Sequence, residues 1–164
     1  MSALAVTERS SEEQCTEPLK VLIADDHPLM LAGVRRVLER AEAIEIVGEA
    51  RSGRELLELI ERRRPGLVLM DLRMPGFVGT EGIERVRAEW PNVKVVVLSA
   101  SEDRATIDGA LSAGASAFIV KSVNVADIAS VLRQVWGAGT VFHATARPQP
   151  VIGGHPVTDD CESP

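Results

Sequence analysis

The amino-acid sequence predicts an α/β fold in which helices cover both faces of a five-stranded parallel sheet. The first observation behind this prediction is that, from Leu19 onward, short apolar stretches alternate five times with longer stretches of helical periodicity. The second is the length of the chain, since 164 residues suit one domain with a real core and are short for two.

The composition of the five expected strands separates the centre of the sheet from its edge. The third and fourth strands are mostly apolar, as central strands are, whereas the second alternates apolar and polar residues, as an edge strand does. The expected strands are 19–24 (LKVLIA), 44–50 (IEIVGEA), 67–70 (LVLM), 93–98 (VKVVVL) and 116–120 (SAFIV).

Local signals mark the ends of the five expected helices. Pro28 suits a first helical turn, and Ser52 with Glu55 forms an S-x-x-E capping box. Gly114 is a natural C-cap, and Asn124 can cap the last helix. The helical stretches are 27–40 (HPLMLAGVRRVLER), 53–64 (GRELLELIERRR), 80–90 (TEGIERVRAEW), 101–114 (SEDRATIDGALSAG) and 125–136 (VADIASVLRQVW).

The two ends of the chain lack this alternation. Residues 1–18 are polar and are expected to form a flexible N-terminal arm, while residues 144–164 are rich in Pro, Gly, Asp and Ser and are typical of a linker or disordered tail. Cys15 and Cys161 lie in these ends, and two distant thiols make neither a disulfide framework nor a metal site. The expected domain therefore spans 19–143.

Charge and hydropathy exclude several classes of function. A net charge of -6 and a pI of about 5.1 argue against broad nucleic-acid binding, because phosphate contacts need clustered Lys and Arg. No apolar run approaches the length of a membrane span, and the first residues do not resemble a signal peptide. We therefore expect a cytoplasmic protein that does not interact with a membrane.

Polar side chains follow four of the five expected strands. Asp25 and Asp26 follow the first, Asp71 the third, Ser99 the fourth and Lys121 the fifth. Ligands of open α/β sheets bind beyond the carboxyl ends of the strands, so these groups are expected to share a cleft. Singly, each suits a helix cap, a turn or a surface charge, but together they indicate a site. Clustered carboxylates suit Mg²⁺ as the cofactor.

His27 directly follows the acidic pair. A lone histidine beside the start of a helix is more often a surface or capping residue than a chemical participant, and we expect it to be one here.

These residues resemble a known family, the receiver domains of two-component response regulators. The matching motifs are DDHP after the first strand, MDLRMPG around Asp71, LSA at Ser99 and FIVKS at Lys121, and the resemblance covers about residues 19–143. The stretches DDHPLMLAGVRRVLE, VGEARSGRELLELI and GTVFH are most similar to the NarL/FixJ subgroup. The resemblance implies a flavodoxin-like (βα)5 three-layer sandwich with strand order 2-1-3-4-5.

The resemblance also implies how the cluster works. Asp71 would be the phosphoacceptor, taking a phosphoryl group from a sensor histidine kinase with the help of Mg²⁺. The metal ligands would be Asp26, Asp71 and the backbone carbonyl of Arg73, with Asp25 acting through water. Lys121 would pair with the phosphoryl oxygens.

A conformational switch is implied by the same resemblance. Ser99 would hydrogen-bond the phosphoryl group, and Phe118 on the fifth strand would move into the space that Ser99 leaves. Phe118 is equally suited to a plain core position.

Two substitutions depart from the family pattern. Ser122 stands where many relatives have a proline in a cis peptide, so the geometry of the Lys121–Ser122 bond is left open. Val78 stands where Asn or Asp is frequent, which would loosen or reshape the loop after Asp71. These departures keep a second hypothesis open, a receiver fold that dimerises without phosphorylation.

Catalytic turnover and direct DNA binding are both disfavoured. A Mg²⁺-dependent phosphohydrolase would want an acid/base Asp at position 73, which is Arg. No basic helix pair follows His143, so this chain is not expected to bind DNA directly; it is either part of a transcription factor with a C-terminal helix-turn-helix domain or a stand-alone receiver.

We also expect a homodimer favoured by phosphorylation, because the last helix has many apolar positions. They are Val125, Ile128, Val131, Leu132 and Val135.

Overall fold

The computed structural model of the chain describes residues 17–138 and 142–144. The expected arm and tail, except for residues 17, 18 and 144, lie outside the described residues. The elements in order are β1 Leu19–Ala24, α1 Pro28–Leu38, β2 Ile44–Ala50, α2 Gly53–Arg63, β3 Leu67–Met70, α3 Glu81–Glu89, β4 Lys94–Ser99, α4 Arg104–Ser112, β5 Ala117–Val120, α5 Val125–Ala138 and β6 Phe142–Ala144.

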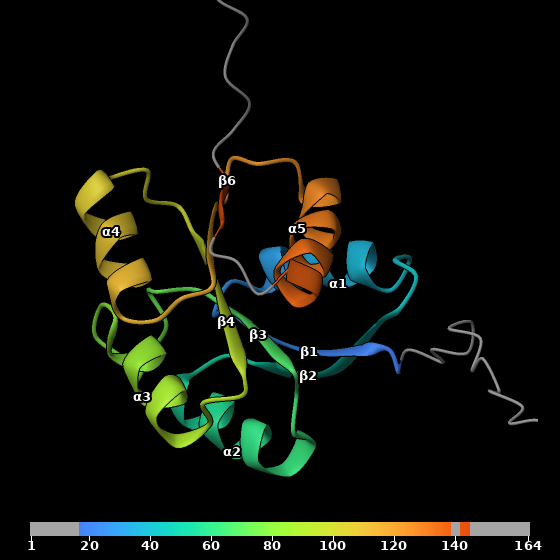
Figure 1. Cartoon of the computed structure of the whole chain (residues 1–164), viewed down its shortest axis with the longest axis horizontal. Coiled ribbons are helices and arrows are strands. Elements are labelled where there is room, and N and C mark those ends of the chain that lie inside the picture. The colour runs from blue at the N-terminus through green and yellow to red at the C-terminus, as the bar shows by residue number, and fades with distance from the viewer. Residues whose placement is uncertain (1–16, 139–141, 145–164) are drawn as a thin grey trace, which may run out of the picture.

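A single parallel sheet forms the middle layer of a three-layer sandwich (Figure 1). Its strand order is β2-β1-β3-β4-β5-β6, which confirms the expected flavodoxin-like order 2-1-3-4-5 and adds a sixth strand. β6 pairs in parallel with β5, and its three residues cross the domain boundary expected after residue 143. So short a strand carries no periodicity of its own, so its pairing depends on the open edge of β5.

The strand residues alternate between two apolar cores, one on each face of the sheet. On β1, for example, Val21 and Ile23 face α1 and α5, whereas Leu22 and Ala24 face α2, α3 and α4. All the residues of β3 and β5 are buried, as expected for strands covered on both faces.

The helix ends follow the expected local signals. Pro28 opens α1, and Gly114 follows α4 with a φ of 105°, a conformation that favours glycine. The backbone N–H of Glu55 donates to Ser52 Oγ at 3.3 Å, but the Glu55 carboxylate accepts from the N–H of Arg51 at 2.8 Å. In a regular capping box the Glu55 carboxylate would accept from the N–H of Ser52, so here this second hydrogen bond is shifted by one residue to Arg51.

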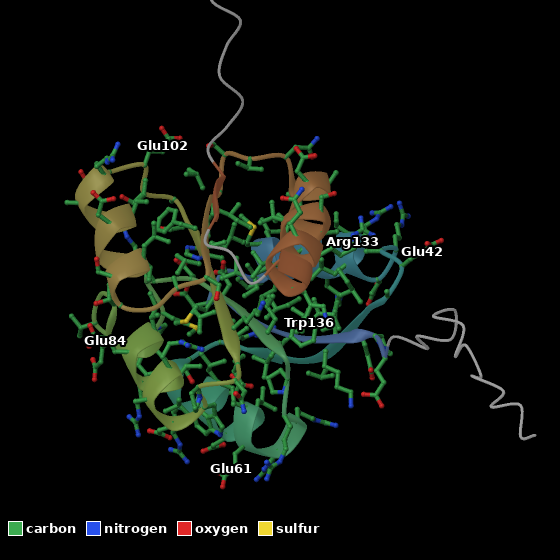
Figure 2. All side chains as sticks on the ribbon, in the orientation of Figure 1. Glu42, Glu61, Glu84, Glu102, Arg133 and Trp136 are labelled. Atoms are coloured by element: carbon green, nitrogen blue, oxygen red, sulfur yellow. The ribbon has the colours of Figure 1, made fainter. Side chains whose placement is uncertain are left out.

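The apolar positions of α5 face the core. Ile128, Leu132 and Val135 are buried, and Val125 and Val131 are partly buried against the same core. Most of these positions therefore pack against the core, so the number of apolar residues in this helix is by itself no evidence for a dimer surface. Trp136 near the end of α5 is one of three large apolar side chains that are exposed among the described residues (Figure 2).

None of the helices in the described part of the chain combines the length and the apolar character that crossing a membrane requires.

Candidate phosphoacceptor site

Strand register brings the predicted site residues to one edge of the sheet. Ala24 of β1 pairs with Met70 of β3, so the residues that follow them, Asp25 and Asp71, are neighbours. The ladder continues past the strand end, because the Asp71 N–H donates to the Ala24 carbonyl at 2.8 Å. The carboxyl ends of four strands thus converge, as the sequence predicted.

Asp71 is a buried carboxylate in the centre of this edge. The residue is only 3% exposed, and its Oδ1 accepts a hydrogen bond from the backbone N–H of Arg73 at 3.2 Å. A buried charge is costly unless it is paired, so the carboxylate needs a compensating partner.

Lys121 is the cation that compensates this charge. Its Nζ lies 2.9 Å from Asp71 Oδ2 and 2.8 Å from Asp25 Oδ2, and its own side chain is 14% exposed. Burial lowers the pKa of Lys121, but close contact with the two carboxylates and their charges outweighs this effect and raises the pKa above its usual value. The ammonium is therefore charged at neutral pH.

The β1–α1 junction adds two more groups to the cluster. Asp26 is partly exposed, and the Nδ1 atom of His27 lies 3.0 Å from an oxygen of Asp26, 3.0 Å from Asp25 Oδ1 and 4.0 Å from Asp71 Oδ2. His27 is exposed and stands at the N-cap of α1, as expected, but its ring makes no capping bond and turns to the carboxylates. Its contact with the cluster was not predicted from the sequence.

The cluster fits a divalent cation. Asp25, Asp26, His27 and Asp71 each present a ligand atom, and these atoms all lie within 4.8 Å of one another. Asp25 Oδ2 and Asp26 Oδ1 are buried, and Asp25 Oδ2 lies 2.8 Å from Lys121 Nζ while Asp26 Oδ1 lies 3.0 Å from His27 Nδ1. Three carboxylates against one ammonium leave negative charge uncompensated, and oxygen donors of this kind suit Mg²⁺.

Ser99 and Phe118 lie on the paired strands β4 and β5. Ser99 is 1% exposed, and its Oγ accepts a hydrogen bond from the N–H of Ser101 at 3.2 Å. Phe118 is fully buried in the core on the side of α4, together with Ile107 and Ala110. The ring thus occupies a core position in this structure.

The two departures from the family pattern are resolved locally. The described part of the chain contains no cis peptide bond, so the Lys121–Ser122 bond is trans. The Ser122 hydroxyl donates to Glu102 Oε1 at 3.1 Å, which joins the loop after β5 to the loop before α4. Val78 is 82% exposed, so its side chain packs little against the rest of the fold. Pairwise bonds such as Ser122–Glu102 leave no sequence signal.

Comparison with known proteins identifies the family. The model of the response regulator receiver domain matches residues 21–133, and the chain belongs to this family of phosphoacceptor signalling domains of two-component systems. The response regulator VraR of Staphylococcus saprophyticus is 35% identical over 127 residues, which are 77% of this chain and 61% of VraR. The chain spans about three fifths of the length of the curated relatives it matches.

Solved structures agree with this assignment. The receiver domain of the response regulator NarL from Mycobacterium tuberculosis is 36% identical, with a TM-score of 0.69 and coverage of 74% of this chain and 98% of that one. RcsB from Salmonella enterica serovar Typhimurium bound to the rprA promoter is 27% identical, with a TM-score of 0.70 and coverage of 76% and 63%. RcsB has also been solved as two dimers on two parallel DNAs. This chain is accordingly a receiver domain of the NarL type.

Proposed function

We propose that Asp71 accepts a phosphoryl group from the phosphohistidine of a sensor histidine kinase. The observation that carries this proposal is the buried Asp71 carboxylate, 2.9 Å from the Lys121 ammonium and grouped with two further acids at the strand ends. A carboxylate that served only a surface salt bridge would not be buried beside two further acids.

The transfer is a substitution at phosphorus. An Asp71 carboxylate oxygen forms a bond to phosphorus as the phosphorus–nitrogen bond to the histidine breaks, and the imidazole leaves with the bonding electron pair. Lys121 is placed to pair with the phosphoryl oxygens, since it already contacts the accepting carboxylate. The same groups assist the later hydrolysis that returns Asp71 to its free form.

Asp26, Asp71 and the Arg73 carbonyl would hold Mg²⁺ directly, and Asp25 would hold it through water. When bound, the ion offsets the negative charge that gathers between the carboxylates and the incoming phosphoryl group. The uncompensated charge of the three carboxylates supports a cation at this site.

Phosphorylation acts as a switch through Ser99 and Phe118. The Ser99 hydroxyl, which now accepts from the Ser101 N–H, turns to donate to a phosphoryl oxygen, and the surroundings of Phe118 adjust on β5. Because the two residues lie on adjacent, paired strands, a shift at one reaches the other.

The switch would control an output domain. We propose a receiver spanning 19–143 in a longer, cytoplasmic transcription regulator, with a helix-turn-helix domain that follows it and binds DNA. RcsB has been solved bound to promoter DNA in the presence of a phosphomimetic, and as dimers on DNA, which supports DNA binding by the full-length regulator and formation of a homodimer.

Intact-protein mass after incubation with a small-molecule phosphodonor tests the proposal. One added phosphoryl group is expected in Mg²⁺ and none in EDTA, with Asp71→Asn unreactive and the exposed Asp108→Asn reacting like wild type. No adduct on the wild type, together with no binding of fluoroberyllate, would favour the alternative of a receiver fold that works without phosphorylation.

A further inference from the structure

The loop between β3 and α3 is tied to the start of α2 through its backbone. The Phe77 N–H donates to the Met74 carbonyl at 3.4 Å and closes a turn, in which Gly76 has a φ of 95° that favours glycine. The N–H of Gly53, the first residue of α2, donates to the Pro75 carbonyl at 2.7 Å. The turn is thereby held against a second element of the fold.

The Phe77 ring occupies space that two glycines leave open. A Cβ added to Gly53 would lie 2.7 Å from ring Cε2, and a Cβ added to Gly82 would lie 2.6 Å from ring Cδ2. Both separations are far shorter than the optimal distance of about 3.5–4.0 Å between non-bonded carbon atoms. The half-buried ring packs against the core here because the first turns of α2 and α3 both carry glycine.

Phe77 therefore holds in place the loop that Val78 was expected to loosen or reshape. The Val78 side chain is 82% exposed and anchors nothing, but the ring one residue earlier fixes the loop between two helices. Closer to the site, Leu72 and Met74 are also buried, and they flank Arg73 on both sides. The segment that carries the Arg73 carbonyl is thus fastened at each end.

We propose that Phe77 is a positioning residue for the magnesium site, holding the loop so that the Arg73 carbonyl is ready to bind the ion. The proposal rests on the proposed function, in which this carbonyl is a direct ligand. A ligand held in place before binding costs less ordering, and groups behind the ligands of a metal site commonly affect its affinity for this reason.

A MgCl2 titration of the isotope-labelled chain, followed by amide chemical shifts, tests the proposal without requiring phosphorylation. Phe77→Ala is expected to weaken Mg²⁺ binding by about tenfold, the lower end of the effect seen for groups behind metal ligands. Phe77→Leu keeps an apolar side chain in the space beside Gly53 and Gly82 and is expected to recover most of the Mg²⁺ affinity. Val78→Ala, the matched control on the same loop, is expected to bind as the wild type does.

A second series of variants keeps Phe77 and places a methyl group at Gly53, in the space that the ring occupies. Gly53→Ala pushes on the ring and is expected to weaken Mg²⁺ binding like Phe77→Ala, whereas adding it to Phe77→Ala causes no further loss. Gly33→Ala in α1 is the control, because its new Cβ would have no neighbour within 4 Å.

The outcomes separate this inference from the function on which it rests. No Mg²⁺-dependent shift in the wild type would overturn both. Wild-type binding with equal affinity in Phe77→Ala, or undiminished affinity in Gly53→Ala, would overturn the positioning role alone. If Phe77→Ala does not fold, Gly53→Ala and Phe77→Leu decide the question by the same titration.

Discussion

Lys121 is the single ammonium among the buried carboxylates of the described residues, and Lys121→Met should show how much the fold depends on it. The Nζ atom lies 2.8 Å from Asp25 and 2.9 Å from Asp71, and both carboxylate side chains are 3% exposed. Methionine keeps most of the volume and removes the charge, so two like charges are left buried side by side when no metal is present.

The magnitude follows from these distances. At an effective dielectric constant of about 20, each contact is worth roughly 6 kcal/mol of Coulomb attraction before the cost of removing the ions from water. That cost is several kcal/mol per ion, and removal of one partner from a buried pair typically destabilises by about 3–5 kcal/mol. We expect Lys121→Met to lose this amount of unfolding free energy in EDTA.

Urea unfolding at neutral pH, in EDTA and in Mg²⁺, measures the effect. Lys20→Met, which changes an exposed lysine, is the control and should stay within about 0.5 kcal/mol of the wild type. The double variant Asp71→Asn with Lys121→Met should recover at least half of the loss, because one of the two stranded charges is gone. Mg²⁺ should stabilise Lys121→Met more than the wild type, because the ion no longer competes with the ammonium.

A Lys121→Met protein as stable as the wild type in EDTA would contradict this expectation. A double variant less stable than Lys121→Met alone would contradict it as well. Either result would mean that the ammonium does not compensate the buried carboxylates.

Three smaller perturbations test local features by urea unfolding. Gly114→Ala forces a side chain into a backbone with a φ of 105° and should cost about 1–2 kcal/mol; no loss would contradict the assigned backbone. Asp103→Ala removes the acceptor of the Thr106 N–H at the start of α4 and should cost about 0.5–2 kcal/mol, with Asp103→Asn retaining most of the stability. Ser122→Ala removes an exposed hydrogen bond to Glu102 and should cost at most about 1 kcal/mol, and a larger loss would mean that Ser122 supports more than this one contact.

Local patterns in the sequence were sufficient to predict the architecture and the membership of the site. Strand and helix patterns are local, and they predicted a parallel sheet with helices on both faces, while the order 2-1-3-4-5, which the family resemblance implied, was also confirmed. Cap signals such as Pro28 and Gly114 lie where they were expected. Asp25, Asp71 and Lys121 converge because parallel strands place their carboxyl ends on one edge, a rule that needs no knowledge of side-chain packing.

The contacts that cross between elements depend instead on how the chain folds in space. The strand β6 forms only because the edge of β5 is open, and His27 joins the acids because the start of α1 turns its ring toward them. The space for the Phe77 ring requires two glycines, Gly53 and Gly82, which belong to different helices and lie 29 positions apart in the chain. Such contacts join residues whose own local patterns are ordinary, and their distance in space is set by the packing of whole helices and strands, so no single stretch of the sequence predicts them.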